Sequence, residues 1–472
     1  MVSLTEKTKC QHPFQQSGTD AVAVHKSRKR TYIAAEFATL ILAFIVFMHA
    51  YRPSCNTSRV FSKDPALRNN SIILGSHERP YVFFPNDLGL SNLHTPEEVR
   101  YPKCGSTDRS MHYAIKFNVT DEFQVLDLSP AQDARGAIVV QRGPATQISD
   151  MEVEISIAYA SPFVPDVSHE FDALANTLQL SYASSKCVQV NVVINLRPDT
   201  HKTLREFSMT TEMLYLSMEW SLIGQWTISS SIPLTAASVT GEIFGYFVAD
   251  GNLHLRNEAG TIGVFLIPRL HSDVPMMLES INATTVSGYL DVEMYVTGEP
   301  PKPADLWPMM PWTHTAHFYS DTGDVRAAIP MGRFTNYTSD TGDVAAILIP
   351  FGAADEHARS DFRTQSTRGD TYVHVYNTLQ ESLDDSKIDP LLSLRSRHKV
   401  VNGDMRIRYP YSWYGELEGV VSNGKLKFDG SRLSNVEKGA GWVKAKRGDG
   451  ASFMESWVED GDLDLEVGLG PY

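Results

Sequence analysis

The stretch SDTGDVRAAIP at residues 320–330 recurs 19 residues further on as SDTGDVAAILIP at residues 339–350. Each copy places a glycine after a small polar residue, which is typical of a turn that needs a positive φ. The residues that follow alternate in character, the pattern of a short strand with one apolar face. Each strand ends in Ile-Pro, and proline stops a strand because it lacks a ladder donor. The two copies therefore predict a repeated turn-and-strand unit.

Looser copies of this unit extend over the C-terminal part of the chain. A second pair with a 19-residue offset begins at Gly241 and Gly260. Further Gly-x-apolar starts are Gly288, Gly369, Gly403, Gly415 and Gly461. A unit of one or two strands cannot bury its apolar face alone, whereas stacked units bury a continuous column. We therefore predict a β-solenoid over residues 196–472, with a β-sandwich of similar hairpins as the alternative.

Short strands are also predicted upstream of the repeat. Alternation or β-branched enrichment marks five segments: 111–118, 123–128, 136–142, 151–159 and 186–196. Residues 106–195 are accordingly expected to form an N-terminal β region. Together with the predicted solenoid, they give an all-β fold over residues 106–472. The charged segment 379–398 is expected to be a surface loop.

A membrane anchor is predicted near the N-terminus. Residues 1–30 carry six basic and two acidic residues, a net charge of +4, and adjoin the apolar run 31–51. About 20 apolar residues span a bilayer as a helix, and the positive-inside rule places residues 1–30 in the cytoplasm. Residues 52–105 are rich in Pro, Asn and Ser and are interpreted as a stalk. A cleaved signal peptide and a buried helix are the alternatives for residues 31–51.

Glycosylation sequons and cysteines fit an extracellular or lumenal C-terminal part. The sequons all follow the predicted span, at Asn56, Asn69, Asn118, Asn282 and Asn336. Of the four cysteines, Cys104 and Cys187 are the more domain-like pair for a disulfide, Cys55 is a candidate for cross-linking two chains, and Cys10 would be cytoplasmic. So few cysteines exclude a disulfide-rich scaffold.

Four stretches carry a resemblance to a known family: GEPPKPAD at 298–305, the two SDTGDV copies, IPFGAAD at 349–355 and YPYSWYGELEG at 409–419. With them the chain resembles the putative-adhesin β-solenoid domains, a large family of unknown function, as found in uncharacterised fungal single-pass membrane proteins. The similarity covers roughly residues 190–470. It implies an exported structural or adhesive role and supplies no catalytic residues.

The remaining motifs give little support for catalysis. The net charge of −14 argues against nucleic acid as the main partner. Asp-Thr-Gly at 321–323 and 340–342 spells the aspartic-protease tripeptide, but the copies are too close in sequence to come from two lobes. Asp460-Gly461-Asp462 matches the Asp-x-Asp of type II glycosyltransferases, without the alternating strands and helices of a nucleotide crevice.

We therefore predict a type II single-pass glycoprotein at the cell surface or in the secretory pathway, with a structural, adhesive or polymer-binding ectodomain. It is expected to have no catalytic activity, no cofactor and no metal. The expected partners are the lipid bilayer and either a cell-wall polysaccharide or another protein. The alternative is a carbohydrate-active enzyme of the secretory pathway, either a type II glycosyltransferase or a β-helix polysaccharide hydrolase or lyase.

Overall fold

A computed structural model describes residues 104–105, 107–119, 122–127, 134–183, 187–198, 202–218, 226–228, 234–249, 251–268, 278–294, 313–350, 359–378 and 389–469. The chain divides into two compact units, Met1–Ser76 and His77–Tyr472, and every described residue belongs to the second. The predicted tail, span and most of the stalk lie outside the described residues. Within the described ranges, no helix is long and apolar enough to cross a bilayer.

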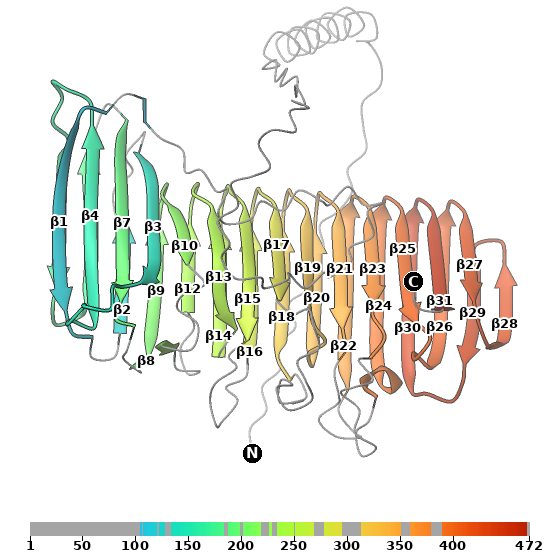
Figure 1. The fold of residues 1–472 in the computed structure, drawn as a ribbon. Helices are drawn as coiled ribbons and strands as arrows, with labels where there is room; N and C mark the ends of the chain where they lie inside the picture. Colours follow the sequence, from blue (N-terminus) through green and yellow to red (C-terminus); the bar gives the residue numbers. More distant parts are fainter. Residues whose placement is uncertain are drawn as a thin grey trace, which may run out of the picture. The chain divides into compact units, whose positions relative to one another are not determined.

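The described part of the chain is almost entirely β-structure, arranged in two large sheets (Figure 1). Sheet A has 14 strands, in the spatial order β1-β4-β7-β3-β10-β13-β15-β17-β19-β21-β23-β25-β31-β27. Sheet B has 15 strands, in the order β28-β29-β26-β30-β24-β22-β20-β18-β16-β14-β12-β9-β2-β6-β5. Strands β8 and β11 form a separate two-stranded sheet.

The strands of sheet A are β1 (Arg109–Phe117), β3 (Ala134–Arg142), β4 (Met151–Tyr159), β7 (Val188–Leu196), β10 (Tyr215–Met218), β13 (Ile243–Ala249), β15 (Ile262–Pro268), β17 (Leu290–Met294), β19 (Val325–Pro330), β21 (Val344–Ile349), β23 (Thr371–Val375), β25 (Met405–Pro410), β27 (Leu426–Gly430) and β31 (Leu463–Leu469).

The strands of sheet B are β2 (Glu122–Asp127), β5 (Asp166–Asp172), β6 (Thr177–Ala183), β9 (Glu206–Thr211), β12 (Leu234–Ser238), β14 (Gly251–Asn257), β16 (Leu278–Thr285), β18 (Thr315–Ser320), β20 (Phe334–Ser339), β22 (Ser360–Arg368), β24 (Leu394–Asn402), β26 (Gly415–Asn423), β28 (Leu433–Gly439), β29 (Trp442–Arg447) and β30 (Ser452–Asp460). The others are β8 (Lys202–Leu204), β11 (Trp226–Ile228) and the 3₁₀ turn η6 (Pro390–Leu392).

From β12 to β25, consecutive strands alternate between the two sheets, and from β14 onward each strand pairs in parallel with the strand two before it. The register follows the sequence repeat: Val344 on β21 pairs with Val325 on β19, and Ser339 on β20 pairs with Ser320 on β18. Equivalent positions of successive units thus lie side by side. Because of this alignment, the apolar residues of each unit lie beside the apolar residues of the next unit.

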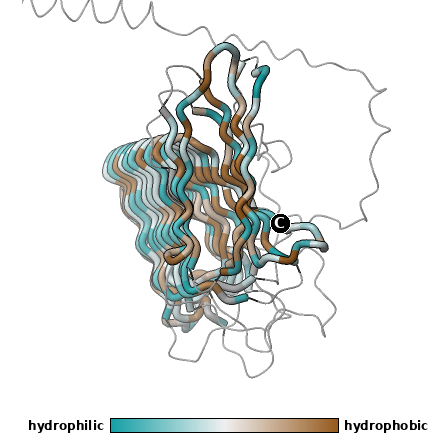
Figure 2. The backbone as a smooth tube through the Cα atoms, turned by 90° about the vertical axis from the view of Figure 1, so that its left-hand side faces the viewer, coloured by the Kyte–Doolittle hydropathy of each residue, from teal (hydrophilic) through white to brown (hydrophobic). Residues whose placement is uncertain are grey.

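Buried apolar side chains from both sheets form one core, and Figure 2 shows hydrophobic positions alternating with hydrophilic ones along the backbone of the strands. The inward positions of β19 and β21 are fully buried, as the alternation predicts. Aromatic rings stack from strand to strand inside: the ring centroids of Phe318 and Tyr337 are 5.0 Å apart, and those of Tyr337 and Phe362 are 5.9 Å apart. Burying each such side chain contributes roughly 1.5–3 kcal/mol, so the continuous core stabilises strands that would be unstable alone.

One glycine from each unit lies above the glycine of the preceding unit. A Cβ built on Gly342 would lie 2.4 Å from the carbonyl oxygen of Gly323, and one on Gly369 would lie 2.2 Å from that of Gly342. The column contains Gly241, Gly260, Gly288, Gly323, Gly342, Gly369, Gly403, Gly461 and Gly424, in spatial order. The backbones approach too closely at this edge for any side chain.

The C-terminal strands do not follow the sequence order. The pair β30 and β31 lies between β24–β25 and β26–β27, although it is the last pair along the chain. Beyond β26, the antiparallel strands β29 and β28 end sheet B, and β27 ends sheet A. At the opposite end, β1 and β5 are antiparallel edge strands.

Several details differ from the sequence-based expectations. The prediction of a surface loop over residues 379–398 is wrong for residues 394–398, which belong to strand β24. Gly415 begins a strand of sheet B and lies outside the glycine column, whereas Gly424 joins it. The two regions predicted on either side of residue 195 share both sheets, since β3 pairs with β10 and β2 pairs with β9.

Candidate functional site

The outer face of sheet B presents a flat array of polar side chains. Strand register places outward residues in straight rows across the sheet. The central row runs His254, Asn282, His317, Asn336, Arg363, Arg397, Glu455 and Glu418. The residues between them along each strand point into the core. This face is therefore accessible over many parallel strands.

Four exposed cations gather on two neighbouring strands of this face, and we call them the basic strip. They are Arg363 on β22 and Arg395, Arg397 and Lys399 on β24. Arg397 forms an ion pair with Glu455 at 3.3 Å. Among the described residues, Arg363, Arg395 and Lys399 have no carboxylate within ion-pair distance. Asp361 is the one carboxylate within these outward rows of β22 and β24.

Aromatic rings flank the basic strip on both sides. The guanidinium of Arg363 lies 5.2 Å from the ring centroid of Phe334 on β20, and the ammonium of Lys399 lies 4.6 Å from that of Trp457 on β30. Cation–π contacts of this kind hold a charged group over a ring while leaving it in solvent. Neutral groups, Asn336, Thr338 and Gln365, occupy the adjacent positions.

A ladder of aspartates follows the glycine column along the turns. The carboxylate of Asp324 accepts a 2.8 Å hydrogen bond from the backbone N–H of Asp343, and the carboxylate of Asp343 accepts one from the N–H of Asp370. The series continues at 2.8 Å: the carboxylates of Asp370, Asp404 and Asp462 accept from the N–H groups of Asp404, Asp462 and Lys425, respectively. Each carboxylate thereby pairs with a backbone N–H at the turn of the neighbouring unit. Their role in the turn is structural.

The two Asp-Thr-Gly aspartates come close together at this edge. The hydroxyl of Tyr319 donates to Asp321 and lies 3.4 Å from Asp340. These hydrogen bonds, together with burial and the nearby carboxylates, raise the pKa of Tyr319 to about 12. Because Asp340 is exposed, the pair lacks the enclosed, apolar setting in which two carboxyls share a proton.

A buried ionic cluster lies on the outer face of sheet A. The guanidinium of Arg326 on β19 is 2.8 Å from Glu293 and 3.7 Å from Asp291, both on β17. The side chains of Arg326 and Asp291 are each 2% exposed. Burial raises the pKa of the Asp291 carboxyl. Burial and the negative charge of Asp291 together raise the pKa of the Glu293 carboxyl. Burial outweighs the opposing effect of the Arg326 charge, so the pKa values of both carboxyl groups lie above their usual range.

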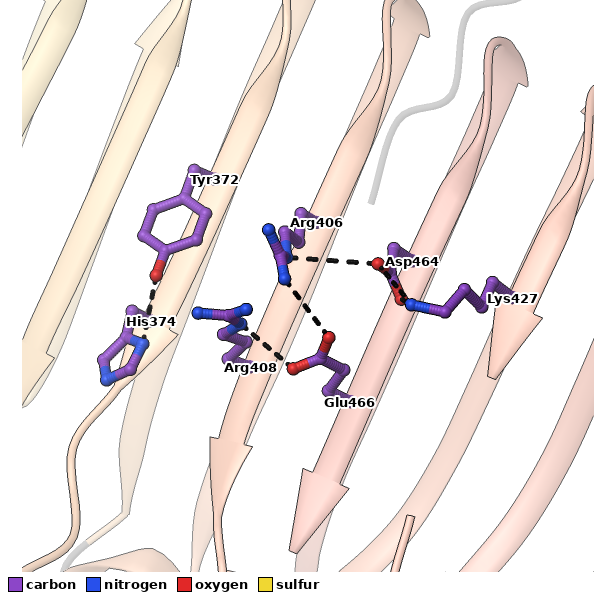
Figure 3. A network of polar contacts seen from close by, with 7 residues as sticks. All are labelled: Tyr372, His374, Arg406, Arg408, Lys427, Asp464 and Glu466. Carbon is purple, nitrogen blue, oxygen red and sulfur yellow. Dashed lines mark hydrogen bonds and ion pairs between the residues drawn. The ribbon is translucent and has the colours of Figure 1, made fainter. Parts of the chain in front are cut away.

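A second network crosses sheet A near the C-terminus (Figure 3). Glu466 on β31 lies 3.0 Å from Arg408 and 3.4 Å from Arg406, both on β25. Asp464 lies 3.9 Å from Arg406 and 2.9 Å from Lys427 on β27. Each carboxylate is shared by two cations, and the three cations and two carboxylates leave the network with a net charge of +1 across three strands.

Tyr372 and His374 on β23 extend this network, with the tyrosine hydroxyl 3.2 Å from the ring nitrogen Nδ1. Burial, followed by the charge of Arg408, lowers the pKa of His374 to about 4. Within the residues that the structure describes, no three His, Cys, Asp or Glu side chains converge in a group that could hold a metal ion.

The structure describes some of the predicted modification sites. Asn282 and Asn336 both lie on the outer face of sheet B, and the amide of Asn336 donates to Thr338 Oγ1 at 3.1 Å. Asn118 is exposed, and its amide oxygen accepts a bond from the N–H of Asp150. Asn56, Asn69, Cys10 and Cys55 lie outside the described residues.

Cys104 and Cys187 form a disulfide, with Cα atoms 5.6 Å apart. The bond ties the beginning of the described β-structure to the residue before β7. This is the pairing expected from the sequence.

Sequence reasoning missed the basic strip because the predicted loop, residues 379–398, covers the first part of β24 with Arg395 and Arg397. Its inward residues include Ser396 and His398, so the strand does not show the usual polar–apolar alternation. The usable signal was the alternation of the cations Arg395, Arg397 and Lys399 with smaller or less polar residues.

Comparison with known proteins finds distant structural likenesses only. No family model and no curated protein matches the chain. A putative adhesin from Bacteroides fragilis matches with 10% identity and a TM-score of 0.27, covering 76% of this chain and 98% of that one. One from Parabacteroides merdae has 9% identity, a TM-score of 0.24 and coverages of 76% and 96%. A putative cell adhesion protein from Clostridium sporogenes has 7% identity, a TM-score of 0.15 and coverages of 76% and 100%. These TM-scores are too low for the likeness to indicate a shared function.

Proposed function

We propose that this chain is a membrane-anchored extracellular or lumenal glycoprotein whose β-solenoid binds a polymer, in the manner implied by its resemblance to the putative-adhesin β-solenoid domains of fungal single-pass membrane proteins. The solenoid interpretation is supported by the alternation of strands between two parallel sheets and by the glycine column. The anchor is the apolar run 31–51. The disulfide supports an oxidising compartment for the C-terminal part.

One observation carries the binding role: the outer face of sheet B is an accessible, regular array of polar and aromatic side chains. Neighbouring strands of a sheet are about 4.8 Å apart. A polymer lying on this face therefore meets outward side chains at regular intervals. Weak contacts repeated along such a surface add up to firm retention.

The polymer-binding function is tested by retention of the full-length chain, purified in detergent, on insoluble cell-wall polysaccharide, chitin and β-glucan. We expect saturable retention on at least one of them. Absence of retention on all three would reject this function. Protease protection of the chain in sealed microsomes tests the orientation, since we expect residues 52–472 to be protected and residues 1–30 to be cleaved.

A second candidate, a polysaccharide hydrolase or lyase, is favoured by the raised pKa values of Asp291 and Glu293 beside Arg326. Perturbed carboxyl groups of this kind occur at catalytic sites and also in structural ion clusters. The burial of Asp291 argues for the structural role. A hydrolase and lyase screen decides between them: turnover by the natural chain that is lost in Asp291→Asn would establish the enzyme.

A further inference from the structure

We infer that the basic strip is a binding site for an acidic polysaccharide, a linear glycan that carries carboxylate or sulfate groups. This inference rests on the proposed polymer-binding function and names the ligand class of the same face. Its evidence is the position of Arg363, Arg395, Arg397 and Lys399 on two adjacent strands.

The strip is a local exception to the charge of the protein. The chain carries a net charge of −14, yet these two strands present four cations and one carboxylate, Asp361, outward. Elsewhere in the described sheets, outward cations such as Lys427, Lys444 and Arg326 lie within ion-pair distance of carboxylates. Three cations of the strip have no such partner among the described residues. Their free charge favours an anionic ligand.

The geometry suits an extended chain. Alternate residues of a strand are about 6.6 Å apart and neighbouring strands about 4.8 Å apart. Arg395, Arg397 and Lys399 thus form a straight row along β24, and Arg363 lies beside Arg397 in register. An extended polyanion lying along β24 would place successive charges against this row.

The neighbouring groups favour a glycan over a nucleic acid or an acidic protein. Asn336, Thr338 and Gln365 offer neutral donors and acceptors that suit hydroxyl groups. The rings of Phe334 and Trp457 offer apolar surfaces on either side for the C–H faces of sugars. The disulfide between Cys104 and Cys187 is typical of oxidising compartments outside the cytosol and nucleus.

The test measures binding of the full-length chain in detergent to polygalacturonate, to a neutral soluble β-glucan and to a single-stranded DNA oligonucleotide. The test variant is the triple substitution Arg363→Gln, Arg395→Gln and Lys399→Gln. The matched control removes the same charge from sheet A, through Arg109→Gln, Lys116→Gln and Lys427→Gln, whose side chains are exposed. Thermal unfolding of each variant checks the fold, and single Arg395→Gln serves if the triple variant unfolds.

We expect polygalacturonate binding to weaken about tenfold or more in the triple variant, to change less than about twofold in the control, and to decrease with salt. Equal binding by the natural chain and the triple variant would overturn the inference, as would DNA binding of equal strength. Retention of the neutral glucan without polygalacturonate would reject the acidic ligand and leave the proposed function standing. If the insoluble polysaccharides also fail to bind, both fall.

Discussion

At Gly342 the backbone has no room for a single methyl group. Its φ is 152°, in the region that L-residues seldom adopt, and a Cβ would lie 2.4 Å from the carbonyl oxygen of Gly323. Because the atoms that this Cβ would meet all belong to the backbone, the turn itself would have to move.

We expect Gly342→Ala to lower the free energy of unfolding by about 2–4 kcal/mol, measured by denaturant titration. Gly263→Ala on β15 is the control, since its Cβ would meet only an ordinary contact 3.7 Å from Phe244. Equal effects of the two substitutions would show that close packing of the glycines does not limit stability.

His398 is the residue whose ionisation should be felt most strongly by the fold. It lies in the core, with Nδ1 2.9 Å from Thr364 Oγ1 and Nε2 3.1 Å from the Tyr409 hydroxyl. Burial lowers its pKa to about 3, whereas the unfolded chain has a histidine pKa of about 6.5. Between these two values the unfolded state binds the proton more tightly.

The contribution of His398 to stability is therefore complete above about pH 6.5 and is lost as the pH falls toward about 3. Between pH 8 and pH 5, we expect the free energy of unfolding of the natural chain to fall by about 2 kcal/mol more than that of His398→Gln. His254→Gln, at an exposed position of β14, is the control and should leave the pH slope unchanged. An unaltered slope in His398→Gln would mean that the ring is protonated in the folded protein.

At the scale of single strands, the position of a sequon determines what a glycan would cover. Asn282 on β16 and Asn336 on β20 occupy the same row of sheet B, and Asn336 is next in register to Arg363 of the basic strip. A glycan on Asn336 would therefore stand beside that strip, whereas one on Asn282 is four strands away from β24.

We expect Asn282 to carry a glycan, because its side chain is exposed and points away from the core. Enzymatic deglycosylation should shift the gel mobility of the chain made in a eukaryotic host. The shift should decrease in Asn282→Gln, with Asn336→Gln as the matched comparison. An undiminished shift in Asn282→Gln would show that this sequon is unused.

Strand prediction from sequence succeeded where inward residues are apolar and failed where they are not. The alternation of Val344, Ala346 and Leu348 identified β21, and the repeat fixed its register with β19. Strand β24 was missed because His398 and Ser396 point inward. The buried pair of Arg326 and Asp291 was also missed, since nothing local distinguishes covered charges from solvated ones.

At the scale of the whole described unit, the final pair of strands is an internal part of both sheets. Strand β30 lies between β24 and β26, and β31 lies between β25 and β27. The repeat predicts that each unit packs against the unit before it in sequence. It does not predict that the pair β30 and β31 lies between two earlier pairs.

We expect truncation after Gly450 to destabilise far more than loss of a terminal strand pair usually would. It removes β30 and β31, so that β24, β25 and β26 each lose one of two neighbours and β27 loses its partner in sheet A. Limited proteolysis should then cleave within residues 389–450. Deletion of residues 2–76 is the control, because the chain divides into separate units after Ser76. Resistance of the truncated chain would show that β26 and β27 can close the gap.

This internal position also determines when the protein can finish folding. During synthesis, β24 to β29 leave the ribosome before the strands that must separate them. The edges of β25 and β27 that pair with β31 stay open until residues 463–469 have been made, so the two sheets close here only after the strands on both sides of the insertion exist. A chain that stopped before β30 would keep this gap, and the loss would remove an internal part of both sheets.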